Sequence, residues 1–258
     1  MKKQIFIAIF IAFYSITFSQ NQKIEYSFQD KNNHKCTSTL YIINNTESLY
    51  RINDERESGV DKNSNNDNMI YIYNDAISTI FYSGSKKTIT RIPLYKNEII
   101  YSDLNSKIKY KLTGKKKKIY NYNCQEAKLN LNGRKYNIWF TPDVETNFGP
   151  FKINNLPGLI IELYEETNKT KITFKSIKKL TDLAEYNKYK KYILSKTALS
   201  YNEYESKTVK VMTAKKSSMI SKAKEFGATV NFSNDQSAFT EFIIDIPTNL
   251  VSELQKIN

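Results

Sequence analysis

The residue types that carry most protein catalysis are scarce in this chain. Its 258 residues include a single histidine, His34, and two cysteines, Cys36 and Cys124. A Ser-His-Asp triad would have to use His34, which lies in the polar segment Lys31–Lys35, where solvent exposure is the expected state. The sequence contains no Gly-x-Ser-x-Gly, His-Glu-x-x-His or glycine-rich phosphate-binding motif. We therefore predict no catalytic residues and no cofactor.

The sequence shows no metal-ligand pattern and only weak candidates for a pair of catalytic carboxylates. One histidine and two distant cysteines do not make a zinc pattern, so no metal site is predicted. Glu165 and Glu166 are adjacent in a strand-like segment, and neighbouring strand residues point to opposite faces. Asp143 and Glu145 are a second candidate pair. A pair of carboxylates from distant strands, as in glycoside hydrolases, stays open and makes a hydrolase the third hypothesis for function.

The two cysteines have a structural interpretation. A disulfide between Cys36 and Cys124 is plausible for an exported protein. Both residues lie in strand-like sequence. The bridge is the prediction, and two separate thiols buried as small hydrophobic side chains are the alternative. A redox role is not favoured, because the chain has no Cys-x-x-Cys motif.

Residues 1–19 have the features of a secretory signal peptide. Lys2 and Lys3 give a positive start, residues 5–16 are apolar, and Thr17–Ser19 places small residues before the cleavage site. The apolar run is too short for a comfortable membrane span, and no later segment is apolar enough to cross a bilayer. We expect the mature protein to have no transmembrane segment and to be exported, to the periplasm or outside the cell.

The chain is strongly basic, with a formal net charge of +13 at pH 7. Such a charge can attract nucleic acid or an anionic membrane surface. The basic residues are spread along the chain, and an exported protein rarely meets nucleic acid, so no nucleic-acid partner is predicted. The run Lys115–Lys118 is interpreted as the solvated end of a β-hairpin, where lysines discourage edge-to-edge pairing. Anion binding by this run is the alternative.

Short alternating segments dominate the first two thirds of the chain. Their regular spacing, separated by polar turns, is typical of an antiparallel sheet in a sandwich or barrel. Between two of them, residues 53–68 form a polar loop without periodicity. Strands are predicted at Lys23–Gln29, Cys36–Ile43, Ser48–Ile52, Met69–Asn74, Ala76–Tyr82, Lys87–Leu94, Ile99–Ser102, Lys107–Leu112, Ile119–Asn123, Glu126–Asn130, Lys135–Phe140, Leu159–Tyr164 and Lys171–Ile177.

Helical spacing replaces this alternation from about residue 182 to 226. Helices are predicted at Asp182–Leu194 and Ser200–Phe226, and Ser200 with Glu203 fits a capping box. A last strand is predicted at Phe239–Ile246 and a short helical tail at its end.

These elements predict a single β-rich domain over residues 20–258, of the mainly β class with C-terminal helices (α+β). We expect a curved antiparallel sheet or unclosed β-barrel packed on the long helix. This architecture is similar to that of the periplasmic lipoprotein carriers, a likeness that does not fix function.

The segment Ile138–Tyr164 concentrates residues that restrict or free the backbone. It holds the only tryptophan and three of the five prolines. Pro157 and Gly158 suit the second and third positions of a type II turn. Leucines flank this turn, so it is expected to pack against other apolar groups. Two interpretations stay open, a buried corner between two antiparallel strands and an apolar lip or plug at the mouth of a cavity.

This segment carries a resemblance to a known family. Residues Asn155–Ile160 read Asn-Leu-Pro-Gly-Leu-Ile, which resembles the motif that names the GLPGLI family, with Asn155 in place of its first glycine. The preceding Trp139–Pro142 and Gly149-Pro150, and the lead-in around Cys124, are similar to the family pattern as well. The resemblance implies an exported protein of a family known mainly from the Bacteroidetes. It implies a compartment and no activity.

Two functions fit these observations. The first is an exported, periplasmic binding or carrier module for an apolar ligand, a lipid or a peptide. The second is a structural or interaction protein of the cell envelope, in which the Leu156–Leu159 segment is a buried packing turn and an exposed sheet edge recruits an envelope protein. For the first, the predicted ligand-binding residues are Trp139, Phe140, Phe148, Pro150, Leu156, Pro157, Gly158 and Leu159.

Overall fold

The structure is a computed structural model, and it describes residues 21–30, 33, 35–53, 79–84, 87–94, 97–104, 108–131, 134–167, 170–225 and 227. Several sequence predictions lie outside these residues. They are the signal peptide, His34, most of the polar loop at 53–68, the strand at 69–74 and the last strand at 239–246 with its helical tail.

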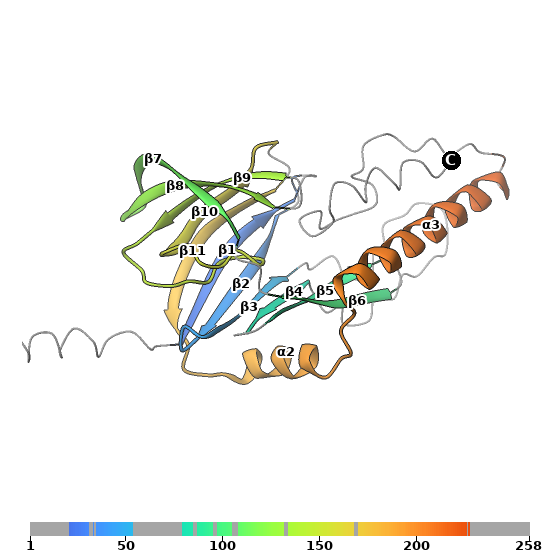
Figure 1. Cartoon of the computed structure of the whole chain (residues 1–258), viewed down its shortest axis with the longest axis horizontal. Helices are drawn as coiled ribbons and strands as arrows, with labels where there is room; N and C mark the ends of the chain where they lie inside the picture. Colours follow the sequence, from blue (N-terminus) through green and yellow to red (C-terminus); the bar gives the residue numbers. More distant parts are fainter. Residues whose placement is uncertain are drawn as a thin grey trace, which may run out of the picture.

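The described residues form one antiparallel sheet of eleven strands in the order β6-β5-β4-β3-β2-β1-β11-β10-β9-β8-β7. The end strands β6 and β7 do not pair with each other, so the curved sheet is unclosed (Figure 1). The predicted fold class is confirmed. The strands are β1 (Gln22–Gln29), β2 (Lys35–Ile43), β3 (Glu47–Asn53), β4 (Ile80–Ser83), β5 (Lys87–Leu94), β6 (Asn97–Leu104), β7 (Tyr110–Ile119), β8 (Tyr122–Leu131), β9 (Arg134–Thr141), β10 (Leu159–Glu165) and β11 (Lys171–Lys179).

Alternation of side chains gives the sheet two faces. In β1, Ile24, Tyr26 and Phe28 are buried on one face, which we call the inner face, and the residues between them lie on the outer face. The register places Leu40 of β2 opposite Ile24, and Tyr50 of β3 opposite Leu40. The inner face therefore continues from strand to strand as one apolar surface.

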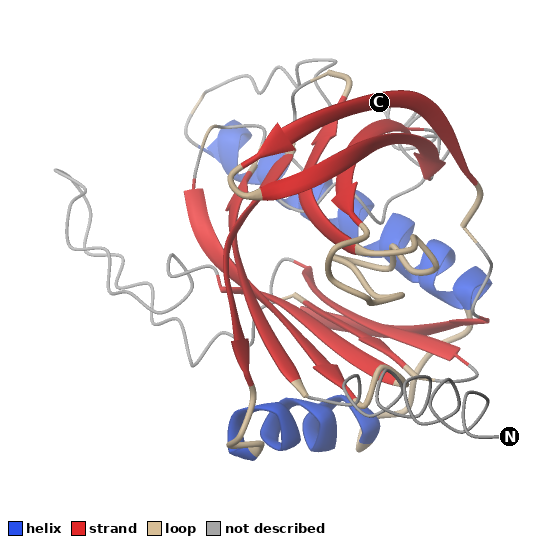
Figure 2. Ribbon diagram, turned by 90° about the vertical axis from the view of Figure 1, so that its left-hand side faces the viewer, coloured by secondary structure: helices blue, strands red, loops and turns tan. Residues whose placement is uncertain are grey.

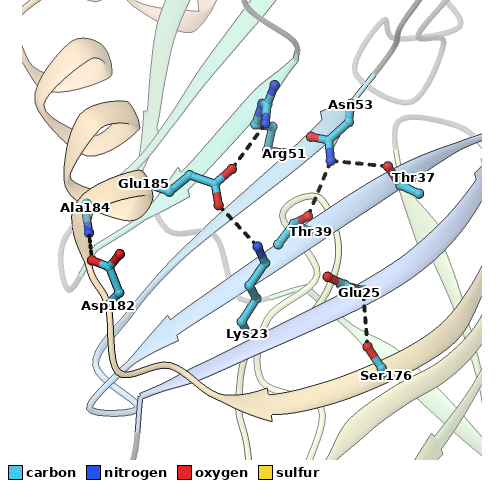
Figure 3. Close-up of polar contacts among 10 residues, drawn as sticks. All are labelled: Lys23, Glu25, Thr37, Thr39, Arg51, Asn53, Ser176, Asp182, Ala184 and Glu185. Carbon is cyan, nitrogen blue, oxygen red and sulfur yellow. Dashed lines mark hydrogen bonds and ion pairs between the residues drawn. The ribbon is translucent and has the colours of Figure 1, made fainter.

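The helix α2 (Ala184–Leu194) covers the outer face from β2 to β6. Its buried side chains, Tyr186 and Ile193, share a core cluster with outer-face residues of these strands. The sequence predicted a start at Asp182. Instead Asp182 precedes the helix, and its Oδ1 accepts a hydrogen bond of 2.8 Å from the backbone N–H of Ala184 (Figure 3). That bond satisfies one of the amides that a helix leaves open at its start.

The chain then closes the β6 edge of the sheet. Leu199 forms a parallel bridge with Tyr101 of β6. The amide of Ser102 donates to the Leu199 carbonyl, and the Leu199 amide donates to the Ile100 carbonyl, each at 2.9 Å. One residue of the linker thus acts as a short extra strand.

The helix α3 (Tyr201–Glu225) follows this bridge. The predicted capping box is present, because Glu203 Oε2 accepts hydrogen bonds of 2.7 Å from both the amide and the hydroxyl of Ser200. Tyr204 is buried and stacks on Tyr101, with ring centroids 4.0 Å apart. Tyr101 lies on the inner face, so the start of α3 packs there. None of the helices among the described residues is long and apolar enough to cross a membrane.

The lysine run is exposed, and it belongs to a strand that the sequence did not predict there. Lys115–Lys118 belongs to β7, and the hairpin turn falls at Tyr120 and Asn121. The register with β8 shifts between Leu112 and Lys116, and Gly114 adopts a positive φ of 79° within that shift. A bulge with a left-handed glycine lets one strand run across the gap between the strands predicted at Lys107–Leu112 and Ile119–Asn123.

The inside of the curve holds a loop as well as the start of a helix. Residues 142–158, here called the central loop, connect β9 to β10 and fold back over the inner face. Figure 2 shows loop segments in tan within the curve of the sheet. Phe151, Ile153 and Leu156 of the central loop belong to the large inner core cluster. This loop fills much of the space that the sequence prediction assigned to the long helix.

Candidate functional site

Internal backbone bonds give the central loop a defined shape. The Gly158 amide donates to the Thr146 carbonyl at 3.0 Å, and the Asn155 amide donates to the Asn147 carbonyl at 2.7 Å. The Leu159 amide donates to the Val144 carbonyl at 3.2 Å. These bonds join the first part of the central loop to its last part, so the loop folds as a compact unit.

Gly158 is the point where the loop passes closest to the sheet. Its φ is 143°, and a Cβ built on it would lie 2.1 Å from the carbonyl oxygen of Thr141 and 2.7 Å from its carbon. Both contacts are with backbone, which cannot move aside as a side chain does. The predicted type II turn is not formed, because the φ of Gly158 differs from the value of about 80° that such a turn needs, and its amide donates to the Leu156 carbonyl at 2.9 Å. The glycine instead lets the loop lie directly against the end of β9.

Phe151 is the residue that the loop inserts into the inner face. Its ring meets the rings of Phe28, Tyr50 and Phe81 edge to face, at centroid distances of 6.2, 5.2 and 5.5 Å. These three residues come from β1, β3 and β4. We call them the aromatic cradle. Phe151 itself is only 3% exposed.

The backbone of Phe151 is strained in this position. Its φ is 59°, a left-handed conformation that bulky residues rarely adopt. Such a conformation costs about 1–3 kcal/mol and persists only when surrounding contacts enforce it. Burial of the ring in the aromatic cradle supplies those contacts.

Two polar anchors hold the loop to the β4–β6 side. Lys152 Nζ donates to the hydroxyl of Tyr101 and to Asp103 Oδ2, each at 2.7 Å. Asn154 Nδ2 donates to the Ser83 hydroxyl at 3.2 Å. The loop therefore spans the inner face, with its ends on β9 and β10 and its tip on strands at the other side of the sheet.

The predicted ligand-binding residues are mostly buried. Phe140, Leu156 and Leu159 are at most 2% exposed, and Trp139 is 7% exposed. Pro150 and Gly158 are buried, Phe148 is half-buried and Pro157 is exposed. Trp139 and Phe140 are neighbours in β9 and point to opposite faces. Lys117 Nζ lies over the ring of Trp139, 4.3 Å from the ring centroid.

The residues that the sequence prediction missed are Phe151 and Lys152. The available signal was the alternation of Phe151 and Ile153 between two proline-containing turns, which is unusual inside a loop. No local pattern pointed to the partner strands, because the aromatic cradle joins residues from three strands far apart in the sequence.

The predicted disulfide is not formed. Cys36 and Cys124 are both thiols in the structure. They lie on β2 and β8, and four strands (β1, β11, β10 and β9) separate these in the sheet. Cys124 is 1% exposed, and burial raises the pKa of its thiol. The alternative interpretation, buried thiols acting as small hydrophobic side chains, describes Cys124.

Two of the candidate carboxylates, Asp143 and Glu166, make structural contacts. Asp143 Oδ2 accepts a hydrogen bond of 3.1 Å from the Asn123 amide, and Glu166 Oε1 pairs with Lys128 Nζ at 3.1 Å. Glu165 is buried. Within the described ranges, no three His, Cys, Asp or Glu side chains gather where they could hold a metal ion.

The strongest electrostatic cluster lies on the outer face, beneath α2. Glu47 accepts hydrogen bonds from the hydroxyls of Tyr82 at 2.7 Å and Tyr186 at 2.5 Å, and from Lys190 Nζ at 2.6 Å. Burial raises the pKa of the Glu47 carboxyl, but the bonds from Lys190, Tyr186 and Tyr82 outweigh it and leave the pKa below its usual value. This cluster fixes α2 to the sheet.

Glu185 of α2 is a second carboxylate that pairs with basic side chains of the strands. Its carboxylate lies 3.2 Å from Lys23 Nζ and 3.6 Å from Arg51 Nη1 (Figure 3). Burial raises its pKa, and the nearby Tyr41 hydroxyl and Lys23 ammonium lower it further than burial raises it. Each contact joins α2 to a strand, so these groups position the helix and do not form a cleft.

A model of a known protein family matches part of the chain. A family model described as "N-glycanase peptide, N-terminal domain" matches residues 85–203. That family differs from the GLPGLI family, which stays a prediction. A sequence search of curated proteins finds no match.

Solved structures show the fold. A crystal structure of PNGF-II superimposes with a TM-score of 0.50 at 17% identity, covering 75% of this chain and 34% of that one. The chain thus spans about a third of PNGF-II, and the likeness shows a shared fold alone.

Two further solved structures match with lower TM-scores. A putative outer membrane lipoprotein-sorting protein domain from Vibrio parahaemolyticus has a TM-score of 0.32 at 10% identity, over 72% of this chain and 96% of its own. MucB has a TM-score of 0.31 at 8% identity, over 66% of this chain and 57% of its own.

Proposed function

We propose that this protein is an exported binding module of the cell envelope that takes an apolar ligand, a lipid or a peptide, onto the inner face of its sheet. In this proposal the central loop occupies the ligand site when no ligand is bound. The observation that carries it is the position of Phe151, a strained residue whose ring meets all three rings of the aromatic cradle, Phe28, Tyr50 and Phe81.

The chemistry of the cradle defines the ligand. Three rings arranged edge to face around a fourth form a site for a flat or chain-like apolar group. The site is lined by strands, which are rigid, and is closed by a loop, which is the part best able to leave. The positive φ of Phe151 favours departure, since the strain is released when the ring withdraws.

The loop is held by buried apolar side chains and, at its tip, by polar anchors. Lys152 and Asn154 hold its tip to β4 and β6 through hydrogen bonds that water can replace. The Gly158 turn at its base stays against β9 and provides a fixed point. Movement of the tip about this base would open the cradle without disturbing the sheet.

Phe151→Gly tests the proposal. Glycine tolerates the positive φ, so the substitution removes the ring and relieves the strain together. A ligand that competes with the Phe151 ring should bind the variant more tightly than the wild type, because less of the site is closed. We expect saturable, one-site binding of the fluorescent fatty acid cis-parinaric acid, about tenfold tighter than to the wild type.

The matched control is Phe174→Ala. Phe174 is a buried ring of the same core cluster, 8% exposed, and it contacts Tyr26, Tyr120 and Tyr122 rather than the aromatic cradle. It should lose stability without gaining affinity for the probe. Equal gains in both variants, or no gain in Phe151→Gly at full cooperative folding, would return the central loop to the role of ordinary core packing.

That second outcome has its own structural support. Leu156 and Leu159 are buried and Gly158 packs on backbone, as expected of a buried corner. If the cradle never opens, the protein is better described as an interaction protein of the cell envelope, whose function lies on its surface.

A further inference from the structure

The last strand of the sheet, β7, presents one side to solvent along its whole length. Among the described residues it pairs with β8 alone. Seven of its ten residues are exposed, and Tyr110, Thr113 and Ile119 are half-buried. The backbone amides and carbonyls on its outer side are therefore available to another chain.

The lysines of β7 fall into two groups. Lys117 Nζ lies 2.9 Å from Glu162, and Lys115 Nζ lies 3.6 Å from Glu126, so these two are neutralised by neighbouring strands. Lys116 and Lys118 are exposed, and no ion pair joins either to another described residue. They are two positions apart, so they project from the same face of the strand.

We propose that β7 is a docking strand for an extended acidic segment of a partner protein, which adds to the sheet beside it. The backbone of β7 would supply the ladder of hydrogen bonds, and alternate carboxylates of the partner would pair with Lys116 and Lys118. Strand addition of this kind takes its affinity from the main chain and its specificity from alternate side chains.

The same lysines explain why the edge does not recruit its own kind. A second copy of β7 would bring lysine against lysine, which is unfavourable at the spacing of paired strands. An acidic strand meets the opposite charge at the same positions. The lysine run thus excludes one partner and selects the other.

The inference does not depend on the central loop. β7 lies at the end of the sheet, and neither Lys116 nor Lys118 contributes to the aromatic cradle. Failure of ligand binding at the cradle would leave this proposal intact, and failure here would leave the cradle intact.

The test uses a fluorescein-labelled peptide of about ten residues that alternates valine and glutamate. Fluorescence anisotropy with the full chain should show saturable binding, and hydrogen exchange should show new protection of amides in β7. A peptide with proline at alternate positions cannot complete the ladder and should not bind. The double substitution Lys116→Glu and Lys118→Glu should weaken binding at least tenfold.

The matched control reverses the same charge elsewhere. Lys207 and Lys224 are exposed on α3, so Lys207→Glu with Lys224→Glu changes the net charge equally. Affinity should stay within about twofold of the wild type. Equal losses in both double variants would show attraction by net charge alone and overturn the proposal.

Two further results would also overturn it. One is peptide binding without protection of the β7 amides, which would place the peptide elsewhere. The other is binding of the protein to phosphatidylglycerol vesicles through Lys116 and Lys118 when the peptide does not bind, which would make the strand a membrane-facing surface.

Discussion

The two ends of the sheet differ in how far other parts of the chain cover them. At the β6 end, the chain supplies its own bridge through Leu199, the helix α2 covers the outer face, and the central loop and Tyr204 cover the inner face. At the β7 end, lysines and an open backbone face solvent. One continuous sheet thus has an end that is covered on both faces and an end strand, β7, whose side chains are mostly exposed.

Polar residues have different roles at the two ends of the sheet. At the covered end, charges such as Glu47 are surrounded by several donors and hold elements together. At the open end, Lys116 and Lys118 have no such partners among the described residues. Substitutions at the covered end should therefore change the free energy of unfolding, and substitutions at the open end should change binding.

The largest effect is expected from Gly158→Ala. The new methyl group would lie 2.1 Å from a backbone oxygen at a φ of 143°, so the loop and the end of β9 must separate. We expect a loss of about 4 kcal/mol in the free energy of unfolding, from overpacking and backbone strain combined. Urea denaturation followed by circular dichroism measures it.

Gly114→Ala is the matched control at the open end. Gly114 also has a positive φ, 79°, but its added methyl would meet nothing within 4 Å. Only the conformational cost remains, about 1 kcal/mol. If the two substitutions cost the same, the close approach of Gly158 to the Thr141 backbone contributes nothing to the cost.

The second effect concerns the cluster beneath α2. Glu47→Gln keeps the shape of the side chain but removes the charge that Lys190 and two tyrosine hydroxyls share. We expect a loss of about 2 kcal/mol at pH 7. The measurement is again the free energy of unfolding, now across a range of pH.

The pH dependence of that loss has a definite sign. The pKa of Glu47 is lower in the folded protein than its usual value of 4.5. Its stabilisation is therefore complete above about pH 4.5 and is lost as the pH falls through the folded pKa. The gap between wild type and Glu47→Gln should narrow between pH 5 and pH 3. A gap that stays constant would mean that the charge is not what Glu47 contributes.

The strands could be predicted from the sequence because their alternation is local. Ile24, Tyr26 and Phe28 show their buried face without any knowledge of their partners, and the capping box of Ser200 and Glu203 shows the start of α3. The error at Lys115–Lys118 has a physical cause. A glycine among polar residues suits both a turn and a bulge, and only pairing with β8 decides between them.

The candidate site was harder to predict, because its parts are distant in sequence. The sequence indicated that Gly158 needs an unusual backbone conformation, but the predicted type II turn was wrong, and what Gly158 approaches is set by the geometry of β9. The disulfide prediction was wrong for a similar reason. Strand-like sequence around Cys36 and Cys124 says nothing about the order of strands, and that order places them four strands apart.

The third effect is smaller and concerns the bridge that Leu199 forms along β6. Weakening this bridge would make the β6 edge resemble the unpaired β7 edge. Leu199→Pro removes the amide that donates to the Ile100 carbonyl at 2.9 Å and so weakens the bridge along β6. We expect a cost of about 1 kcal/mol. Hydrogen exchange of the β6 amides, Ser102 first, should become faster. Unchanged exchange at Ser102 would show that α3, and not the bridge, protects this edge.

The smallest effect on stability is expected at the open end itself. Lys116→Glu with Lys118→Glu changes two exposed side chains without ion-pair partners, so the free energy of unfolding should stay within about 0.5 kcal/mol of the wild type. Thermal and urea denaturation measure it. A larger loss would mean that these lysines stabilise the fold and would remove the contrast between the ends. A stable variant that no longer binds the acidic peptide would instead separate the two roles cleanly, because the covered end would then account for stability and the open end for recognition.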